Sequence, residues 1–377
     1  MEPITLIATA KFGLEAVVKR EVAALGFDDV RGGEGRVTFS AAAEDIPRAN
    51  LWLRCADRVL VQLGEFPALS FDELFRQTRA LPWEQWIPAD GRFPVNARAV
   101  RSTLQSERSC QAIVKKAVAE RLMAAHGTAA LPETGADYGI QVTIRQDRAT
   151  LALDTSGDGL HKRGYRAEAG AAPLTETLAA ALVLLSFWSK GRLLIDPMCG
   201  SGTILIEAAM IGRRMAPGLR RSFAAERWPA VGEGAWPAAR HEATEAVTPS
   251  ETPALFGYDI DADAIRIAKQ NAALAGVGGD ITFEQKALAD LWIDQEYGIL
   301  ISNPPYGQRM AEFREINDLY ITLNKMMRKK RGWSVYILTA DAKFPDYFKR
   351  GRPDRVRKLF NGNIRVDYYQ YYGERGE

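Results

Sequence analysis

Hydrophobic and polar positions follow different patterns in the two halves of the chain. In the first half, alternating stretches such as ITLIATA and GRVTFS predict strands, and LEAVVKREVAAL between them has the apolar spacing of a helix. The stretch YGIQVTIRQDRATLALDTSG alternates on both sides of Gln146-Asp147 and predicts a hairpin. Ser70, and either Ser106 or Ser109, stand where two further helices begin and are predicted N-caps. This half is therefore predicted to be α+β.

In the second half, from about residue 160, strands and helices alternate. GRLLIDPMCGSGTILIEAAMIG reads as strand, glycine-rich turn and helix, and ALFGYDIDADAIRIAKQNAALAG as strand, acidic turn and helix. GILISNPPYG and WSVYILTADAKF add two more strands. The alternation predicts a doubly wound, mainly parallel sheet with right-handed crossovers, which is a Rossmann-like α/β domain. Residues 224–253, rich in Ala, Pro, Glu and Trp, are predicted to form an excursion on the surface.

The composition is that of a soluble globular protein, because 47% of the residues are hydrophobic and 25% are charged. No apolar run is long enough to predict a membrane span, and the N-terminus lacks the pattern of a secretory signal. Cys55, Cys110 and Cys199 form no CxxC pair, and with three histidines they do not indicate a metal site. We therefore expect a cytoplasmic protein, with no metal cofactor and no membrane partner.

The net charge is only +2, but two segments of the chain are strongly basic. Residues 92–121 contain seven Lys/Arg against two Asp/Glu, and residues 325–358 contain twelve against three. Basic zones on a nearly neutral protein favour a polyanion bound at defined places, although solvated helix faces would give the same counts.

The predicted strand ends of the second half carry the candidate chemistry, because ligands of open parallel sheets lie beyond the carboxyl ends of the strands. Gly200 and Gly202 allow close approach of a ligand to the backbone, but their loop has neither the phosphate-loop nor the dinucleotide pattern. Asp196, just before the loop, would repel a phosphate and could hold an ammonium group. Asp259 at the next strand end can accept both ribose hydroxyls, and Asp261 is the expected helix cap. The pattern favours an amino-acid-bearing nucleoside.

The sequence NPPY ends another predicted strand. Its acceptors suit a planar exocyclic amine, whose lone pair is delocalised into the ring. The Asn303 side-chain carbonyl and the Pro304 backbone carbonyl could bind the two N–H bonds and draw the nitrogen towards pyramidal geometry. Tyr306 offers a ring for stacking an extruded base. A plain strand-ending turn is the simpler interpretation of NPPY taken alone.

In this order and spacing, DPMCGSGT, GYDID and NPPY resemble the motifs of class I S-adenosylmethionine-dependent methyltransferases. The segment SGDGLHKRGYRAEAGAAPLTETLAAALV, the following APG and NPPYG resemble bacterial 23S rRNA guanine-N2 methyltransferases that carry a THUMP domain. The resemblance is strong from about residue 157 to the end and weaker before it. It implies a ferredoxin-like segment over residues 1–60, a THUMP RNA-binding domain over 61–160 and a methyltransferase domain over 161–377.

The resemblance and the loop chemistry together define the candidate site. Cofactor contacts are expected from Asp196, Cys199, Gly200, Ser201, Gly202, Thr203, Asp259, Ile260, Asp290, Asn303, Thr175 and Glu176. Catalytic roles are expected for Asn303, Pro304 and Tyr306. RNA contacts are expected from the first basic zone and from the segment joining the halves, at Arg98, Arg101, Lys115, Lys116, Lys162, Arg163 and Arg166. We expect structured RNA, with 23S rRNA as the first candidate, as the partner of a monomer.

Some assignments have alternatives. Related chains usually place an acid near the position of Ala287, and here Asp290 or a backbone group would have to bind the adenine amine. Thr175 and Glu176 suit a helix over the methionine end of the cofactor, but they also suit plain helix capping. Cys199 has no indicated base partner and is interpreted as a small turn residue.

Three other functions are compatible with parts of the pattern. A DNA adenine-N6 methyltransferase shares NPPY, but the first half resembles an RNA-binding module. A protein-glutamine methyltransferase would also suit NPPY, but the basic zones argue against it. A non-catalytic RNA-binding protein that keeps the pocket is supported only by Ala287.

Overall fold

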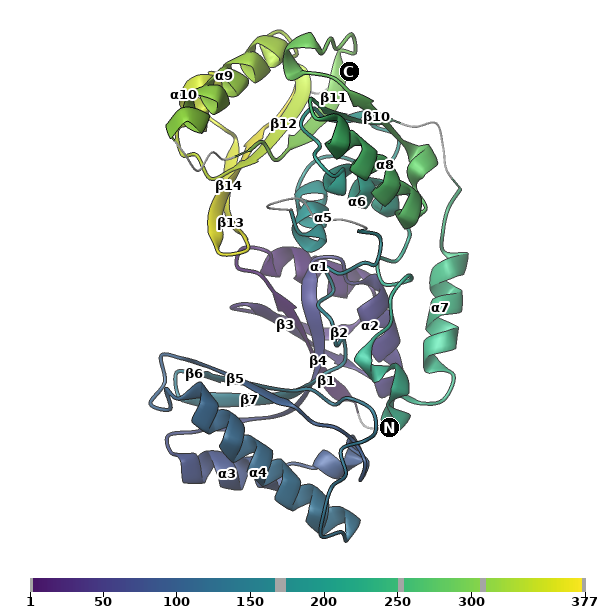
Figure 1. Ribbon diagram of the computed structural model, residues 1–377, viewed down its shortest axis with the longest axis vertical. Helices are drawn as coiled ribbons and strands as arrows, with labels where there is room; N and C mark the ends of the chain where they lie inside the picture. Colours follow the sequence, from purple (N-terminus) through teal and green to yellow (C-terminus); the bar gives the residue numbers. More distant parts are fainter. Residues whose placement is uncertain (1–2, 167–173, 250–253, 306–309, 375–377) are drawn as a thin grey trace. The chain divides into compact units, whose positions relative to one another are not determined.

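The computed structural model describes residues 3–166, 174–249, 254–305 and 310–374. The chain divides into two compact units, coloured mostly purple to blue and teal to yellow in Figure 1. The first unit combines Val18–Leu160 with Met1–Ala10 and Arg221–Glu242, and the second contains Lys11–Val17, His161–Arg220 and Ala243–Glu377.

The first unit contains a seven-stranded sheet in the order β2-β3-β1-β4-β7-β6-β5. All neighbouring strands are antiparallel except β5 and β6. The long strand β4 pairs with β1 on one side and β7 on the other, so the sheet is continuous across residue 60, where the sequence analysis places a domain boundary. The strands are β1 Ile4–Ala10, β2 Asp28–Gly33, β3 Arg36–Ala41, β4 Ala56–Pro67, β5 Val95–Val100, β6 Ile140–Arg145 and β7 Arg148–Asp154.

Local chemistry explains several boundaries in this part of the chain. Gln146 and Asp147 have φ values of 48° and 61°, and two residues with positive φ give the tight turn that joins β6 and β7 as the sequence predicts. The side chains of Ser70 and Ser106 accept hydrogen bonds from backbone N–H groups in the first turns of α3 and α4. The helices before residue 130 are α1 Glu15–Ala24, α2 Ile46–Trp52, α3 Phe71–Ala80 and α4 Glu107–His126, with 3-10 turns at Ala43–Asp45 and Trp83–Gln85.

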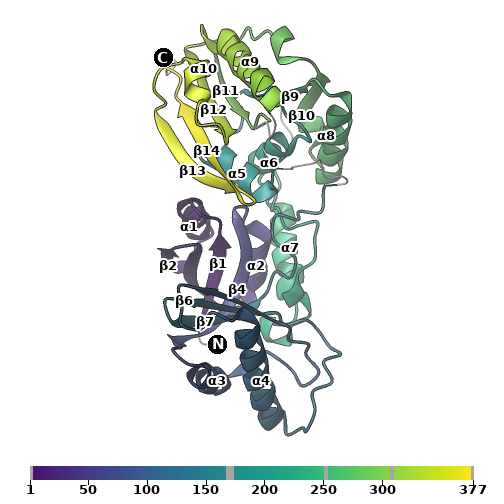
Figure 2. The same cartoon turned by 60° about the vertical axis from the view of Figure 1, so that its left-hand side comes forward.

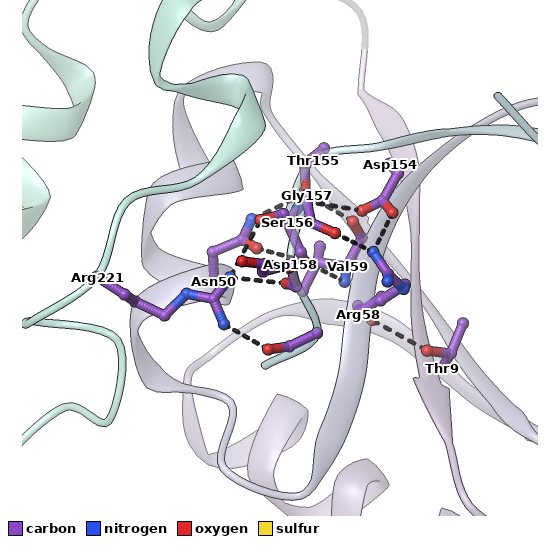
Figure 3. A network of polar contacts seen from close by, with 11 residues as sticks. Thr9, Asn50, Arg58, Val59, Asp154, Thr155, Ser156, Gly157, Asp158 and Arg221 are labelled. Carbon is purple, nitrogen blue, oxygen red and sulfur yellow. Dashed lines mark hydrogen bonds and ion pairs between the residues drawn. The ribbon is translucent and has the colours of Figure 1, made fainter. Parts of the chain in front are cut away.

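A buried polar network fixes the chain where it leaves β7 (Figure 3). The Asn50 side chain, only 1% exposed, donates to Thr155 Oγ1 at 2.9 Å and accepts from Ser156 Oγ at 2.7 Å. The Arg221 guanidinium donates to the backbone oxygens of Ser156 at 3.2 Å and Asp158 at 2.7 Å. Each of these buried polar groups is therefore satisfied, and the end of the first sheet has a defined course.

The stretch predicted to be a surface excursion is instead a packed part of the first unit over most of its length. Trp228 is 3% exposed, stacks on Tyr138 with ring centroids 4.7 Å apart and donates from Nε1 to Asp137 O. Trp236 is also buried and stacks on Phe223. The tryptophans that made this stretch look unusual are core residues. The stretch contains 3-10 turns at Ala224–Arg227 and Pro229–Val231 and helix α7 Ala235–Glu245.

The second unit contains the predicted doubly wound sheet, in the order β10-β9-β8-β11-β12-β14-β13. The strands from β10 to β12 are parallel, and β14 and β13 continue the sheet antiparallel. The order reverses between β8 and β11, which is where ligands bind in such sheets. The strands are β8 Leu194–Asp196, β9 Leu255–Asp259, β10 Ile281–Gln285, β11 Tyr297–Ser302, β12 Gly332–Thr339, β13 Arg355–Asn361 and β14 Ile364–Tyr371.

Helices cover both faces of this sheet. Helices α5, α6 and α8 lie on one side and α9 and α10 on the other (Figures 1 and 2). On the α9 side, Tyr320 and Leu323 pack with Leu300, Val335 and Ile337 of the sheet in one apolar cluster. Among the described residues, none of the helices combines the length and apolar character needed to cross a membrane. The helices are α5 Glu176–Leu184, α6 Thr203–Gly212, α8 Ala262–Ala275, α9 Met310–Met327 and α10 Phe344–Phe348, with 3-10 turns at Gly278–Asp280 and Leu288–Asp290.

Candidate active site

A cavity of about 290 Å³ opens beyond the carboxyl ends of β8 and β9 in the second unit. Its size is close to the lower end of the usual range for small-ligand pockets, about 300–1,000 Å³. Six of the residues predicted from the sequence to contact a cofactor line it: Asp196, Cys199, Gly200, Ser201, Thr203 and Asn303. The glycine-rich loop and Asn303 of NPPY, which are about a hundred residues apart in the chain, therefore share one pocket.

The two loop glycines have different roles. Both have left-handed backbone conformations, with φ of 51° at Gly200 and 78° at Gly202. A Cβ at Gly202 would lie 2.8 Å from the Phe283 ring, so this glycine is required for the packing of α6 against the sheet. A Cβ at Gly200 would meet no atom within 4 Å, and this glycine lines the pocket. Gly200 thus leaves space beside the backbone on which a ligand can lie.

Asp259 joins the two strand ends. Its Oδ2 accepts from Gly200 N at 2.9 Å and its Oδ1 accepts from Asp261 N at 3.0 Å. Asp261 caps α8 by accepting from Asp263 N, as predicted. The carboxylate of Asp259 therefore fixes both loops around the pocket, and its contact with a ribose stays a prediction.

Asp196 is the buried acid of the site. It is 2% exposed and accepts hydrogen bonds from Ser302 Oγ at 2.7 Å and from Met198 N at 3.2 Å. Burial raises the pKa of Asp196 from its ordinary value of 3.8 to about 7, while the Ser302 hydrogen bond acts in the opposite direction. A cation bound in the cavity would stabilise the ionised form of this group.

Cys199 is not suited to nucleophilic catalysis. Burial raises the pKa of its thiol well above the ordinary value of 9.0, and the charges of Asp196 and Asp259 raise it further. Because the thiolate is the reactive form, Cys199 is an inert residue of the turn, as the sequence suggested.

A second cluster of charges lies next to the cavity. The Arg166 guanidinium donates from Nε to Glu176 Oε1 at 2.9 Å, and from Nη2 to Leu174 O at 2.9 Å and to Thr203 Oγ1 at 3.4 Å. Leu174 and Thr203 line the cavity. Burial raises the pKa of Glu176, and the charge of Arg166 opposes that effect. Arg166 is thus held at the wall of the cofactor pocket, and the interpretation of Arg166 as an RNA contact is corrected.

Arg163 also lies inside the second unit. It is 2% exposed, and its Nε is 3.4 Å from Oε1 of the fully buried Glu207, which also accepts from the Tyr165 hydroxyl. A buried cation with a buried acid cannot reach a phosphate, so the RNA assignment of Arg163 was wrong. The sequence contained a signal for this pair, because a single acid in the apolar helix TILIEAAMIG needs a buried partner.

The other predicted RNA contacts differ in their exposure. Arg98, Arg101, Lys116 and Lys162 are exposed. Lys115 instead donates to Glu133 at 2.7 Å and lies 3.5 Å from the centroid of the Phe93 ring. Lys115 is partly exposed and ion-paired within the fold, and its contact with RNA stays a prediction.

The remaining predicted residues lie at the strand ends. Asn303 is half-buried at the end of β11, and Pro304 after it is buried. Ile260 after β9 is 71% exposed, and Asp290 after β10 is exposed. Thr175 is at the start of α5, but its side chain makes no capping hydrogen bond there. Tyr306 lies outside the described residues.

A doubly wound domain with a glycine-rich loop, an acid at each of the first two strand ends and NPPY at the switch point defines a class I S-adenosylmethionine-dependent methyltransferase. A family model described as the RMKL-like methyltransferase domain matches residues 163–370, and the chain belongs to this family. Models of the RlmL ferredoxin-like domain and of the THUMP domain match residues 5–60 and 68–154.

Similar proteins cover the whole chain. A putative RNA methyltransferase, YpsC, of Bacillus subtilis is 46% identical over 99% of this chain and 97% of its own length. Ribosomal RNA large subunit methyltransferase K/L of Syntrophotalea carbinolica is 37% identical over 96% of this chain, which spans about half (52%) of that relative. The solved structure of SMU.472, a putative methyltransferase complexed with SAH, is 41% identical, with a TM-score of 0.94 and full coverage of both chains.

The residues of the pocket fit S-adenosylmethionine, which is the cofactor. Its sulfonium and ammonium are cations, and the cavity is lined by Asp196, Asp261 and Asp263. Its carboxylate needs a cation, and the guanidinium of Arg166 is held against the cavity wall. Its adenine needs an apolar surface, and the cavity lining includes Met198, Ile204 and Ile267.

Proposed function

We propose that this protein methylates the exocyclic N2 amine of a guanine in RNA, with 23S rRNA as the substrate. The observation that carries the proposal is the position of Asn303 on the wall of the cofactor cavity, directly before the buried Pro304. The presence of a THUMP domain supports RNA as the substrate class. The relative named as a large-subunit rRNA methyltransferase supports 23S rRNA.

The reaction needs positioning more than acid–base chemistry. S-adenosylmethionine supplies a methyl group already activated on a sulfonium. In the proposed mechanism, the Asn303 side-chain oxygen and the Pro304 carbonyl oxygen accept the two amine N–H bonds, which localises the nitrogen lone pair towards the methyl carbon. The new N–C bond forms as the S–C bond breaks, and the bonding electrons leave on a neutral thioether. The nitrogen then loses one proton to water.

The test is methyl transfer with a position-specific product. The protein is incubated with labelled S-adenosylmethionine and, separately, unmodified 23S rRNA, tRNA, DNA and protein, and the modified RNA is digested to nucleosides. N2-methylguanosine from 23S rRNA supports the proposal. N6-methyladenosine, or label in DNA or protein only, would contradict it, and so would binding of the cofactor with no transfer to any substrate.

We also propose that residues 61–160, the predicted THUMP domain, bind the RNA through the exposed cations Arg98, Arg101 and Lys116, with Lys162 in the joining segment. Recognition through phosphates would give weak sequence preference and steep salt dependence. The same proposal includes domain boundaries near residues 60 and 160, a monomeric state and a cytoplasmic location. The absence of a disulfide at Cys55, Cys110 and Cys199 in the described part of the chain fits that location.

A further inference from the structure

The second basic zone of the sequence forms one surface of the methyltransferase unit. Six exposed cations lie in the segments that lead into β12 and β13, and we name this surface the amino-edge platform: Arg328, Lys329, Arg331, Lys349, Arg352 and Arg355. The segments 328–331 and 349–355 together contain eight Lys/Arg and one acid, Asp354. That acid accepts a hydrogen bond from Tyr372 N at 2.7 Å, so it is engaged by the backbone.

Arg350 holds the two segments together. Its Nη2 donates to Lys330 O at 3.0 Å and to Trp333 O at 2.7 Å. Its Nη1 is buried and has no hydrogen-bond partner among the described residues. Because this half-buried arginine donates to two backbone carbonyls of the other segment, it fixes the course of both segments. The fold therefore holds the platform cations close together.

The platform differs from an ordinary solvated face, which mixes both signs of charge. Helix α8 shows such a face, where Arg266 lies 3.4 Å from Asp263. Among the described residues, the ion pair on the platform joins Arg331 to Glu374 at 3.9 Å, with both side chains more than two-thirds exposed. An exposed pair at that distance contributes little to stability, because solvent screens it. A predominantly positive surface of this kind attracts a polyanion.

The chemistry favours the phosphate backbone of RNA. Neither platform segment contains an aromatic residue, so it lacks the stacking surfaces that bind single-stranded bases. Phosphate contacts from Lys and Arg position a nucleic acid without reading its sequence. The platform therefore suits a duplex or folded region of the RNA rather than the nucleotide that is methylated.

The platform lies at the edge of the sheet opposite the methyl-transfer site. β12 begins beside it at Gly332 and ends at Thr339, and β11, parallel to β12, ends at Ser302 before Asn303. Eight residues of strand span about 23 Å at roughly 3.3 Å per residue. An RNA held at both places must extend across the methyltransferase unit.

We propose that the amino-edge platform binds the phosphate backbone of a structured segment of the substrate RNA about 23 Å from the methylated base. The proposal rests on RNA being the substrate. It adds an RNA-binding surface on the catalytic unit, separate from the THUMP domain and from the cofactor pocket.

The test uses the full chain with paired charge reversals. The platform variant is Lys329→Glu with Arg352→Glu, and the matched control is Lys269→Glu with Arg214→Glu, which reverses one exposed lysine and one exposed arginine elsewhere on the second unit. Affinity for unmodified 23S rRNA is measured by filter binding from 50 to 300 mM salt. We expect the platform variant to bind at least tenfold more weakly at 100 mM salt, with a salt slope shallower by about 1–2, because two phosphate contacts are lost.

RNA affinity, vesicle binding, SAH binding with thermal stability, and the nucleoside product separate the outcomes. Unchanged affinity and slope in the platform variant, or an equal loss in the control, would overturn the proposal. Loss of binding to phosphatidylglycerol vesicles with RNA binding unchanged would also overturn it, in favour of a membrane surface. SAH binding and thermal stability should be unchanged in both variants. The proposed methyl transfer is scored separately by the nucleoside product, so an RNA that binds through the platform but receives no N2-methyl group contradicts the proposed function alone.

Discussion

Replacement of Asp196 by Asn should make the protein more stable at neutral pH while weakening its cofactor binding. The folded chain raises the pKa of Asp196 from its ordinary value of 3.8 to about 7, so the folded state holds the proton more tightly than the unfolded state. The contribution of this group therefore favours folding below about pH 4 and is lost as the pH rises to about 7. Above that pH, the buried charge opposes folding.

The magnitude follows from the same pKa. The pKa of Asp196 is about three units higher in the folded state than in the unfolded state, and each unit corresponds to about 1.4 kcal/mol. The ionised group therefore lowers the free energy of unfolding by at most about 4 kcal/mol at pH 8. Relaxation around the charge would reduce this to about 2–4 kcal/mol. Asn keeps an oxygen that can accept from Ser302 Oγ and Met198 N, so the variant loses the charge and not the hydrogen bonds. For a domain of this size, the apo protein should melt about 4–16 °C higher at pH 8.

The assay is calorimetric melting of the ligand-free wild type and Asp196→Asn between pH 4.5 and 8.5. The difference in Tm should grow with pH and level off above pH 7, and subtracting the wild type removes the other titrating groups. Ser302→Ala is the matched control, because losing its hydrogen bond raises the pKa of Asp196 further and should lower the Tm at pH 8. A difference that is constant with pH, or a less stable Asp196→Asn variant at pH 8, would refute the reasoning. SAH affinity of Asp196→Asn should fall at least tenfold by titration calorimetry.

Three other predictions test the site. Asn303→Ala should lower the single-turnover rate on the order of 10²-fold with SAH affinity changed less than threefold; equal loss of both would make NPPY a structural turn. Arg166→Ala should weaken SAH binding at least tenfold but 5′-methylthioadenosine, which lacks the carboxylate, less than twofold; parallel losses would show a purely structural arginine. Arg163→Met should cost about 3–5 kcal/mol in denaturant unfolding because it leaves Glu207 buried and unpaired, and Arg163→Met with Glu207→Leu should recover most of that loss.

The features predicted from the sequence are those with a local signal. The N-cap role of Ser70 and Asp261 depends only on the following turn, and the hairpin at Gln146-Asp147 only on the alternation around it. The parallel sheet and the shared pocket also follow, because alternating strands and helices leave few topologies open. Asn303 and the glycine-rich loop line one cavity because the fold places both at the carboxyl ends of neighbouring parallel strands.

The errors involve partners that are distant in the sequence. Arg163 stands among glycine and lysine, but its partner Glu207 is 44 residues away in the chain. Arg166 pairs with the nearby Glu176, but it also donates to Thr203 at the cavity wall, 37 residues away. The sequence shows the charges and does not show the pairing. Trp228 was misplaced in the same way, because its partner Tyr138 belongs to a strand region 90 residues earlier.

The acidic lining of the cavity favours binding of the cofactor over binding of its product. S-adenosylmethionine carries a sulfonium, and after transfer the product is a neutral thioether, so the ligand loses one positive charge. A cavity lined by Asp196, Asp261 and Asp263 interacts more favourably with the cation than with its product, and the low exposure of Asp196 strengthens that preference because the charge is poorly screened. Methyl transfer neutralises the sulfonium and leaves the ammonium in place, so the product keeps one of the two positive charges that favour the ionised form of Asp196. The buried acid that weakens the ligand-free fold is therefore the same group that favours binding of the cofactor and release of its product.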